Sequence, residues 1–237
     1  GTTGHPSGIS GSDPSSMSVT KLELPQACVS KRSMVSLGAL GVAYASPDGL
    51  IAIGPSGMTN ITERHLKITR EDWQKYKPAS MCAFYHDDQY IVFYDTGSKQ
   101  GGVIIDPQGG GLVEIDLHAE GGHVDLETDS LYLLVNNSIV KWDAGQEAKT
   151  ARWRSRIEVG PPVNHSAAQV VASIYPDIPD GPVMASFYAD GVLRYTHVAT
   201  SREPFRLPGG FLASEWEVEI QSRASIQEVR IGTMGEM

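Results

Sequence analysis

Residues 42–53, with the sequence VAYASPDGLIAI, are two short apolar runs separated by the turn-forming residues PDG. This pattern predicts a β-hairpin, because Pro and Gly supply the backbone angles of a tight turn and the flanking runs suit strands. Similar hairpin patterns occur around Asp88, Asp129 and Asp190. The sequence therefore predicts an all-β protein made of repeated antiparallel hairpins.

The turn residues recur at a regular distance. Asp48, Asp88 and Asp129 are 40 and 41 residues apart, and Asp190 follows after 61. Each of the first three hairpins is followed by a further apolar segment, at residues 58–61, 103–105 and 138–142. A period of about 40 residues with four strands is typical of propeller blades. We therefore expect a propeller-like array of four-stranded units, complete or incomplete, with a β-sandwich as the alternative.

The spacing and composition also predict boundaries. Residues 1–20 are rich in Gly, Ser and Thr and are interpreted as a linker or loop. Residues 21–150 form the propeller-like β units. Residues 151–237 form a further β unit, with a proline-containing insertion and a C-terminal hairpin made of residues 216–220 and 226–231.

One segment is helical in character. Residues 70–77 follow Thr69, a candidate N-cap, and end before Pro78. We expect a helix of two turns that packs on a blade edge through Trp73 and Tyr76, where it would also be a candidate docking element.

A second segment is a candidate interface. Basic and apolar side chains alternate along residues 152–159, as in a strand with one wet face or in an interface strand. The candidate interface residues here are Arg152, Trp153, Arg154 and Arg156.

Charge and composition limit the function classes. The chain has 237 residues and a formal net charge of −9, which gives no electrostatic reason to bind nucleic acid. Cys28 and Cys82 stand apart, without the spacing of a zinc site, and we expect both to be reduced. No apolar run reaches the length of a membrane-spanning helix and no cleavable leader is visible.

The sequence offers only weak candidates for chemistry. His118 and His123 flank Glu120 and Asp125, but scattered loop residues of these types are usually solvated. The glycine run at 109–111 lacks the Lys and Ser or Thr of a phosphate loop. We therefore predict no enzyme activity, no metal and no cofactor.

Several segments resemble structural proteins from the tail gene clusters of short-tailed bacteriophages, namely the tail nozzle or tail tubular components. The similar segments are residues 24–34, 42–50, 68–73, 152–156, 162–164, 204–208 and 216–218. The resemblance covers residues of about 20 to 235 and is structural, so it assigns no functional residue.

The resemblance implies a non-enzymatic virion protein that is made in the bacterial cytoplasm and assembles around the DNA exit channel. Its implied partners are copies of itself, neighbouring tail proteins, and genomic DNA that passes without tight binding. The acidic composition agrees with such a channel, because like charges repel phosphates. The alternative is a receptor- or carbohydrate-binding module at the tail tip.

Overall fold

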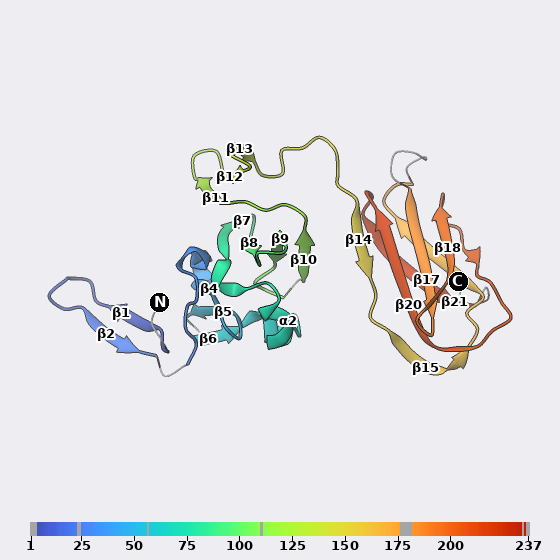
Figure 1. Cartoon of the computed structure of the whole chain (residues 1–237), viewed down its shortest axis with the longest axis horizontal. Helices are drawn as coiled ribbons and strands as arrows, with labels where there is room; N and C mark the ends of the chain where they lie inside the picture. The colour runs from blue at the N-terminus through green and yellow to red at the C-terminus, as the bar shows by residue number, and fades with distance from the viewer. Residues whose placement is uncertain are drawn as a thin grey trace. The chain divides into compact units, whose positions relative to one another are not determined.

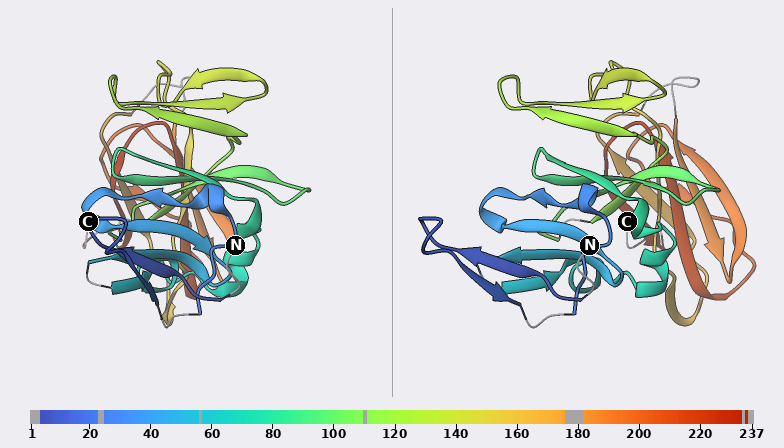
Figure 2. Two further views of the ribbon diagram at one scale, coloured as in Figure 1. Left: turned by 90° about the vertical axis from the view of Figure 1, so that its left-hand side faces the viewer. Right: turned by 60° about the vertical axis from the view of Figure 1, so that its left-hand side comes forward.

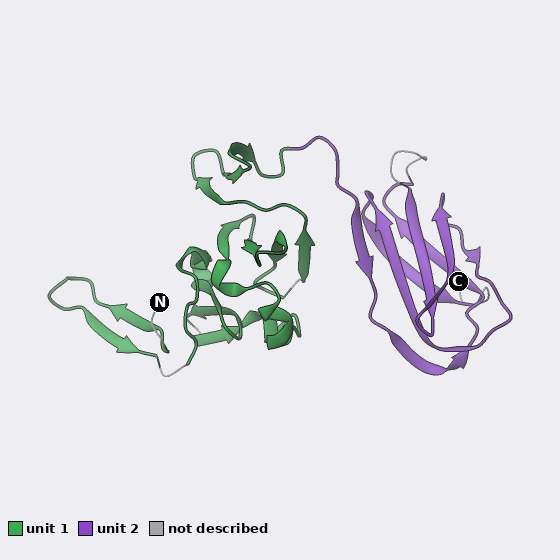
Figure 3. Ribbon diagram, in the orientation of Figure 1, with its two compact units in different colours: residues 1–144 green, residues 145–237 purple. Residues whose placement is uncertain are grey.

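The computed structural model describes residues 4–22, 25–55, 57–109, 111–175, 182–233 and 235. Strands make up 51% of the chain and helices 8%, so the all-β prediction is confirmed. The chain divides into two compact units, residues 1–144 and 145–237 (Figure 3). This division lies a few residues before the boundary that the sequence predicts at 150.

After a two-stranded N-terminal sheet, three antiparallel sheets follow one another along the described part of unit 1 (Figures 1 and 2). The first contains β3 (Val35–Ser36), β4 (Val42–Ser46), β5 (Gly49–Gly54) and β6 (Gly57–Asn60). The second contains β7 (Cys82–His86), β8 (Gln89–Asp95), β9 (Gln100–Ile105) and β10 (Leu112–Ile115). The third contains β11 (Gly121–Asp125), β12 (Ser130–Val135) and β13 (Ser138–Lys141). Strands that are neighbours in sequence pair in every sheet, so each sheet is a simple meander.

The predicted hairpins lie where the turn pattern placed them. Residues 42–46 of β4 pair with residues 49–53 of β5, so that Ser46 lies opposite Gly49. In the second hairpin, Tyr85 of β7 lies opposite Tyr90 of β8. Asp87 and Asp88 both have positive φ, 48° and 58°, as the two central residues of a tight hairpin turn require. Acidic turn residues are therefore explained by backbone geometry.

A propeller goes beyond what these sheets establish. A four-stranded meander is the repeating unit of a propeller blade, and the first two sheets have this form. The third sheet has three strands among the described residues. These sheets do not establish a ring of blades, so the propeller stays a prediction.

The core of unit 1 lies beneath two short helices, α1 (Ile61–Arg64) and α2 (Arg70–Gln74). The helix expected over residues 70–77 is confirmed, although its α-helical part ends at Gln74. Thr69 is its N-cap, because the Thr69 hydroxyl accepts a hydrogen bond from the Asp72 amide at 3.2 Å. The buried Trp73 and Tyr94 anchor the helix on the sheets.

The N-terminal segment forms a hairpin, so the prediction of a linker or loop over residues 1–20 is wrong for its described part. β1 (Ser7–Ser10) pairs with β2 (Ser18–Lys21), and Ile9 lies directly opposite Val19. The turn is closed by Asp13, whose carboxylate accepts a hydrogen bond from the Ser15 amide at 2.8 Å. The low apolar content of this segment concealed a short alternation with period two.

Unit 2 contains two antiparallel sheets. The larger sheet consists of β14 (Ala151–Arg154), β15 (Glu158–Val163), β17 (Val183–Ala189), β18 (Val192–Ala199) and β20 (Ala213–Ser222). The smaller sheet consists of β16 (Ala167–Ala172), β19 (Phe205–Arg206) and β21 (Ile226–Gly232). Val170 from the smaller sheet and Phe187 and Ile220 from the larger sheet share one buried core. Unit 2 is therefore a sandwich, the alternative that the sequence left open.

Two predictions for this unit are corrected. The prediction of a C-terminal hairpin is wrong, because β20 pairs with β14, β15 and β17 whereas β21 pairs with β16. Both strands alternate in the way a hairpin would, yet the short connection between them crosses from one sheet to the other. The Asp190 turn joins β17 to β18 within the sandwich, so it does not mark a fourth blade with an insertion. Pro176 and Pro179 of the expected insertion lie outside the described residues.

Two further observations concern the whole described chain. Within the described ranges, no helix has the length and apolar character needed to cross a membrane. Cys28 and Cys82 are both free thiols, and burial raises the pKa of each.

Candidate assembly interface

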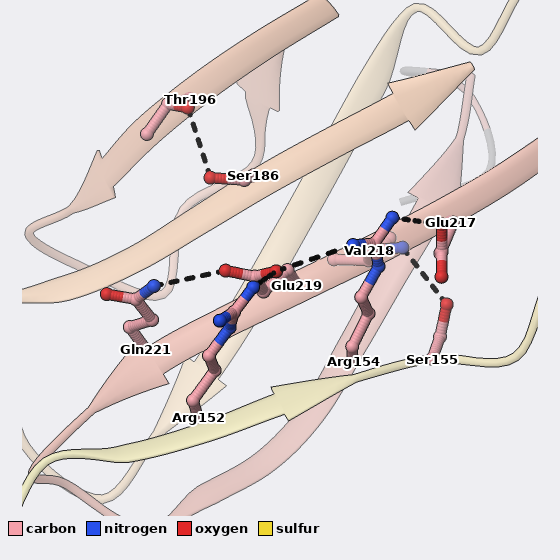
Figure 4. A network of polar contacts seen from close by, with 9 residues as sticks. All are labelled: Arg152, Arg154, Ser155, Ser186, Thr196, Glu217, Val218, Glu219 and Gln221. Atoms are coloured by element: carbon pink, nitrogen blue, oxygen red, sulfur yellow. Dashed lines mark hydrogen bonds and ion pairs between the residues drawn. The ribbon is translucent and has the colours of Figure 1, made fainter. Parts of the chain in front are cut away.

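Strand β14 carries the predicted interface residues and displays them on two faces. Among the described strands it pairs only with β20, and Trp153 lies opposite Ile220, whose side chain belongs to the core. Arg152 and Arg154 alternate with Trp153 along the strand and so lie on the other face, where Figure 4 shows them beside Glu219 and Glu217. The strand therefore presents an aromatic residue to one side and two guanidinium groups to the other.

The arginine face forms a network of ion pairs within the sheet. Arg152 Nη2 lies 2.6 Å from Glu219 Oε2, and Arg154 Nη2 lies 2.6 Å from Glu217 Oε2 (Figure 4). Gln221 Nε2 donates to the other oxygen of Glu219 at 3.0 Å. Both arginines are therefore paired with carboxylates of their own sheet.

The environment of Glu219 shows the strength of this arrangement. Its side chain is 5% exposed although it lies on the outer face of the sheet. The hydrogen bond from Arg152 is the main reason that the pKa of Glu219 lies below its ordinary value, and the same bond raises the pKa of Arg152. Arg154 also lies over the ring of Tyr188, 4.3 Å from its centroid. The two arginines therefore hold β14 against β20 and stabilise the sheet.

The segment after β14 is fixed by Ser155. Its amide donates to the Val218 carbonyl at 2.8 Å, and its hydroxyl accepts from the Val218 amide at 3.0 Å. Arg156 follows and pairs with Glu158 at 2.6 Å, both side chains being exposed. Arg156 is thus the predicted interface residue with the most accessible charge, although a neighbouring carboxylate compensates it.

The other face of β14 borders an apolar groove. Trp153 is 55% exposed and lines two adjacent cavities with volumes of about 670 and about 480 Å³. We call their shared opening the Trp153 groove. Its apolar lining residues include Trp153, Val159, Pro161, Val163, Val229 and Ile231.

The groove exists because the two sheets of unit 2 differ in width. The larger sheet continues to β14 and β15, whereas the smaller sheet ends at β21. None of the described strands therefore covers the side chains on the inner face of β14. Among the described strands, β21 pairs only with β16, so its outer edge is open beside the groove.

Trp73 lies in the interior of unit 1. Its side chain is fully buried and its indole Nε1 donates to the Ser46 carbonyl at 2.8 Å. Tyr76 is half-buried, donates its hydroxyl to Glu114 and packs edge-on against Tyr94 with ring centroids 5.1 Å apart. Burial is the main cause that raises the pKa of Tyr76, and the hydrogen bond to Glu114 raises it further. Trp73 therefore offers no surface to a partner, because the helix turns it inward to cover the sheets.

The structure does not bring the scattered His and acidic residues into a cluster of three. This holds for all described residues, including His118, His123, Glu120 and Asp125.

The accessible apolar residues that follow Trp153 were not among the predicted interface residues. Ile157 and Val159 are exposed, as are Ile9 and Val19 of the N-terminal hairpin. The alternation along residues 152–159 was the available signal, but it cannot indicate which face lacks a covering strand. No protein-family model and no curated protein matches this sequence.

Proposed function

We propose that this chain is a non-enzymatic structural component of a bacteriophage tail that assembles with copies of itself and with neighbouring tail proteins. The single observation that carries the proposal is the Trp153 groove. A half-exposed Trp beside an open sheet edge is the kind of side chain that contributes most to protein interfaces. The resemblance of the sequence to nozzle proteins supplies the phage context.

The segments that carry this resemblance occupy framework positions. Residues 42–50 span β4 and the start of β5, residues 68–73 include most of α2, and residues 152–156 include the last three residues of β14. Residues 216–218 lie in β20, against which β14 is paired. Shared framework residues support a shared architecture, whereas they assign no chemistry.

The direct test is to look for the chain in phage particles. Particles purified by density gradient from cells that produce this protein should contain it, and antibodies against unit 2 should label the tail in electron micrographs. Detection in the cell lysate but not in purified particles would overturn the proposal.

A second measurement addresses the proposed DNA channel. The net charge of −9 predicts that duplex DNA does not retain the protein at about 0.15 M salt, because phosphate contacts require basic side chains. Retention that falls steeply with added salt would contradict a channel wall along which DNA slides.

A glycan-binding role at the tail tip is the second candidate, and the exposed ring of Trp153 is the observation that favours it. Aromatic faces beside a groove can stack on sugar rings. Binding on a glycan array that disappears in Trp153→Ala would support this role over assembly.

A further inference from the structure

The N-terminal hairpin is an unpartnered element of unit 1. Every residue from 7 to 21 is exposed, although β1 and β2 are paired with each other. In Figure 1 the hairpin extends away from the other sheets of this unit. An isolated two-stranded hairpin is only marginally stable in water, so it gains stability when another surface covers it.

The hairpin has two chemically different faces. One face carries Ile9 and Val19, which are 68% and 70% exposed, and Lys21 continues the same face. The opposite face carries small polar residues such as Ser10 and Thr20. This pattern suits a strand that is buried on one face and solvated on the other.

The Trp153 groove offers a complementary surface. It is lined by apolar side chains, and its charged lining residues are Glu158 and Glu228, which pair with Arg156 and Arg230 at 2.6 and 2.7 Å. The hairpin face that carries Ile9 and Val19 matches this apolar lining, and Lys21 on the same face can share one of the two carboxylates with its arginine.

We propose that the N-terminal hairpin of one copy of this chain docks in the Trp153 groove of a second copy. The hairpin adds a strand beside β21, with Ile9 and Val19 facing the groove and Lys21 close to its carboxylates. This inference rests on the assembly role proposed above and names the partner of that site.

Strand β21 is the edge that can accept the hairpin. The other edge beside the groove is formed by β14 and β15. β15 contains Pro161 and Pro162 and therefore lacks two amide donors, and β14 has four residues against seven in β21. Strand β21 has no proline, and the described residues leave its outer edge unpaired. Adding a strand there widens the smaller sheet of the sandwich and covers Trp153.

The first test is sedimentation of the purified full chain over a concentration series up to about 100 μM. The wild type should self-associate. Val19→Asp and Trp153→Ala should each weaken association at least about tenfold, because each removes apolar contact from one side of the same interface. Thr20→Asp is the matched control, since it adds the same charge to the other face of the hairpin and should leave association unchanged.

The substituted positions are exposed, so each variant should keep the wild-type circular dichroism spectrum. A wild type that is monomeric throughout the series would overturn the inference. So would self-association that persists unchanged in Val19→Asp, or that is lost equally in Thr20→Asp.

A charge exchange tests that the contact is between copies. Lys21→Glu and Glu158→Lys should each associate more weakly with themselves than the wild type does. A mixture of the two should recover association several-fold, because the hairpin of the first variant then matches the groove of the second. No recovery on mixing would contradict the assigned pairing. A monomeric protein that is nevertheless found in phage tails would overturn this contact while leaving the proposed place of the chain in the tail intact.

Discussion

Two tryptophans of this chain show how neighbouring strands decide the role of a side chain. Trp73 is on a short helix and is fully buried, whereas Trp153 is on an edge strand and is 55% exposed. Both follow or precede charged residues in the sequence, so local composition does not separate them. The difference arises because α2 lies over the sheets of unit 1, while β14 lies beyond the edge of the smaller sheet of unit 2.

We expect Trp73→Phe to destabilise unit 1 by about 1 to 3 kcal/mol. The substitution keeps an aromatic ring but removes the indole donor and leaves the buried Ser46 carbonyl without its partner. Urea unfolding followed by circular dichroism measures the change. Trp153→Phe is the matched control and should stay within about 0.5 kcal/mol of the wild type, since its ring is exposed. An equal loss of unfolding free energy in the two variants would show that the hydrogen bond from Trp73 to Ser46 does not stabilise unit 1.

Glu219 should make the stability of unit 2 depend on acidic pH. Its pKa in the folded protein lies below the ordinary value of 4.5, mainly because of the hydrogen bond from Arg152. The stabilisation is therefore complete above 4.5 and is lost as the pH falls through the lower, folded-state pKa.

The measurement compares the wild type with Glu219→Gln by urea unfolding between about pH 6 and about pH 3. The free-energy difference between them should be largest at the higher pH and should shrink at the lower pH. Glu203→Gln, in an exposed loop, serves as the control and should follow the wild-type profile. A difference that stays constant across this range would contradict a role for the Glu219 charge.

At the scale of elements, glycines fix how the first sheet of unit 1 is connected. Gly41 and Gly57 have nearly the same φ, 102° and 105°, which disfavours any residue with a side chain. A Cβ atom on Gly41 would lie 2.0 Å from the Ile53 carbonyl oxygen, whereas one on Gly57 would meet nothing within 4 Å.

This pair separates backbone strain from steric conflict. Gly57→Ala should cost about 1 to 3 kcal/mol through strain alone. Gly41→Ala should cost more, because the Ile53 carbonyl belongs to β5 and can move only if the sheet distorts. Thermal unfolding of both variants provides the comparison. A smaller loss in Gly41→Ala than in Gly57→Ala would mean that the chain relaxes freely around residue 41.

The element scale is also where the sequence predicted most reliably. The turns at Asp88, Asp129 and Asp190 have the expected positive φ, because a tight hairpin turn is a local feature that a few residues determine. The N-terminal hairpin was missed because its strands contain few apolar residues. The predicted partner of β20 was wrong because strand pairing depends on which sheet the chain enters after residue 222. The alternation with period two is the same whether the next strand joins the same sheet or the other one.

At the scale of the whole molecule, the repeat period predicted propeller-like units over residues 21–150 and a further β unit with an insertion over residues 151–237, and this further unit is a sandwich. The longer interval before Asp190 was the signal of a change in architecture, and an insertion into one more blade explains such an interval equally well in sequence terms. The Trp153 groove could not be predicted for a related reason. It depends on the unequal widths of two sheets, which no local pattern encodes.

The division into two units predicts a single early site of proteolysis. Residues 143–150 are exposed and lie between β13 and β14, and Lys149 is the basic residue within this segment. Unit 1 and unit 2 each contain a separate buried core, so cleavage of the connection leaves both cores intact. Limited trypsin digestion should therefore first yield two products that mass spectrometry assigns to residues 1–149 and 150–237.

Each product should retain its own β-sheet circular dichroism signal, because the strands of one unit pair only within that unit among the described residues. Lys149→Gln should slow this first cut, whereas Lys67→Gln, a substitution of another exposed lysine, should not. Initial cleavage inside a sheet, or loss of all structure when the connection is cut, would mean that the two units depend on each other for stability. Separate stability of the two units would allow each to make its own contacts in an assembly, with the groove of unit 2 open to a hairpin supplied by another copy.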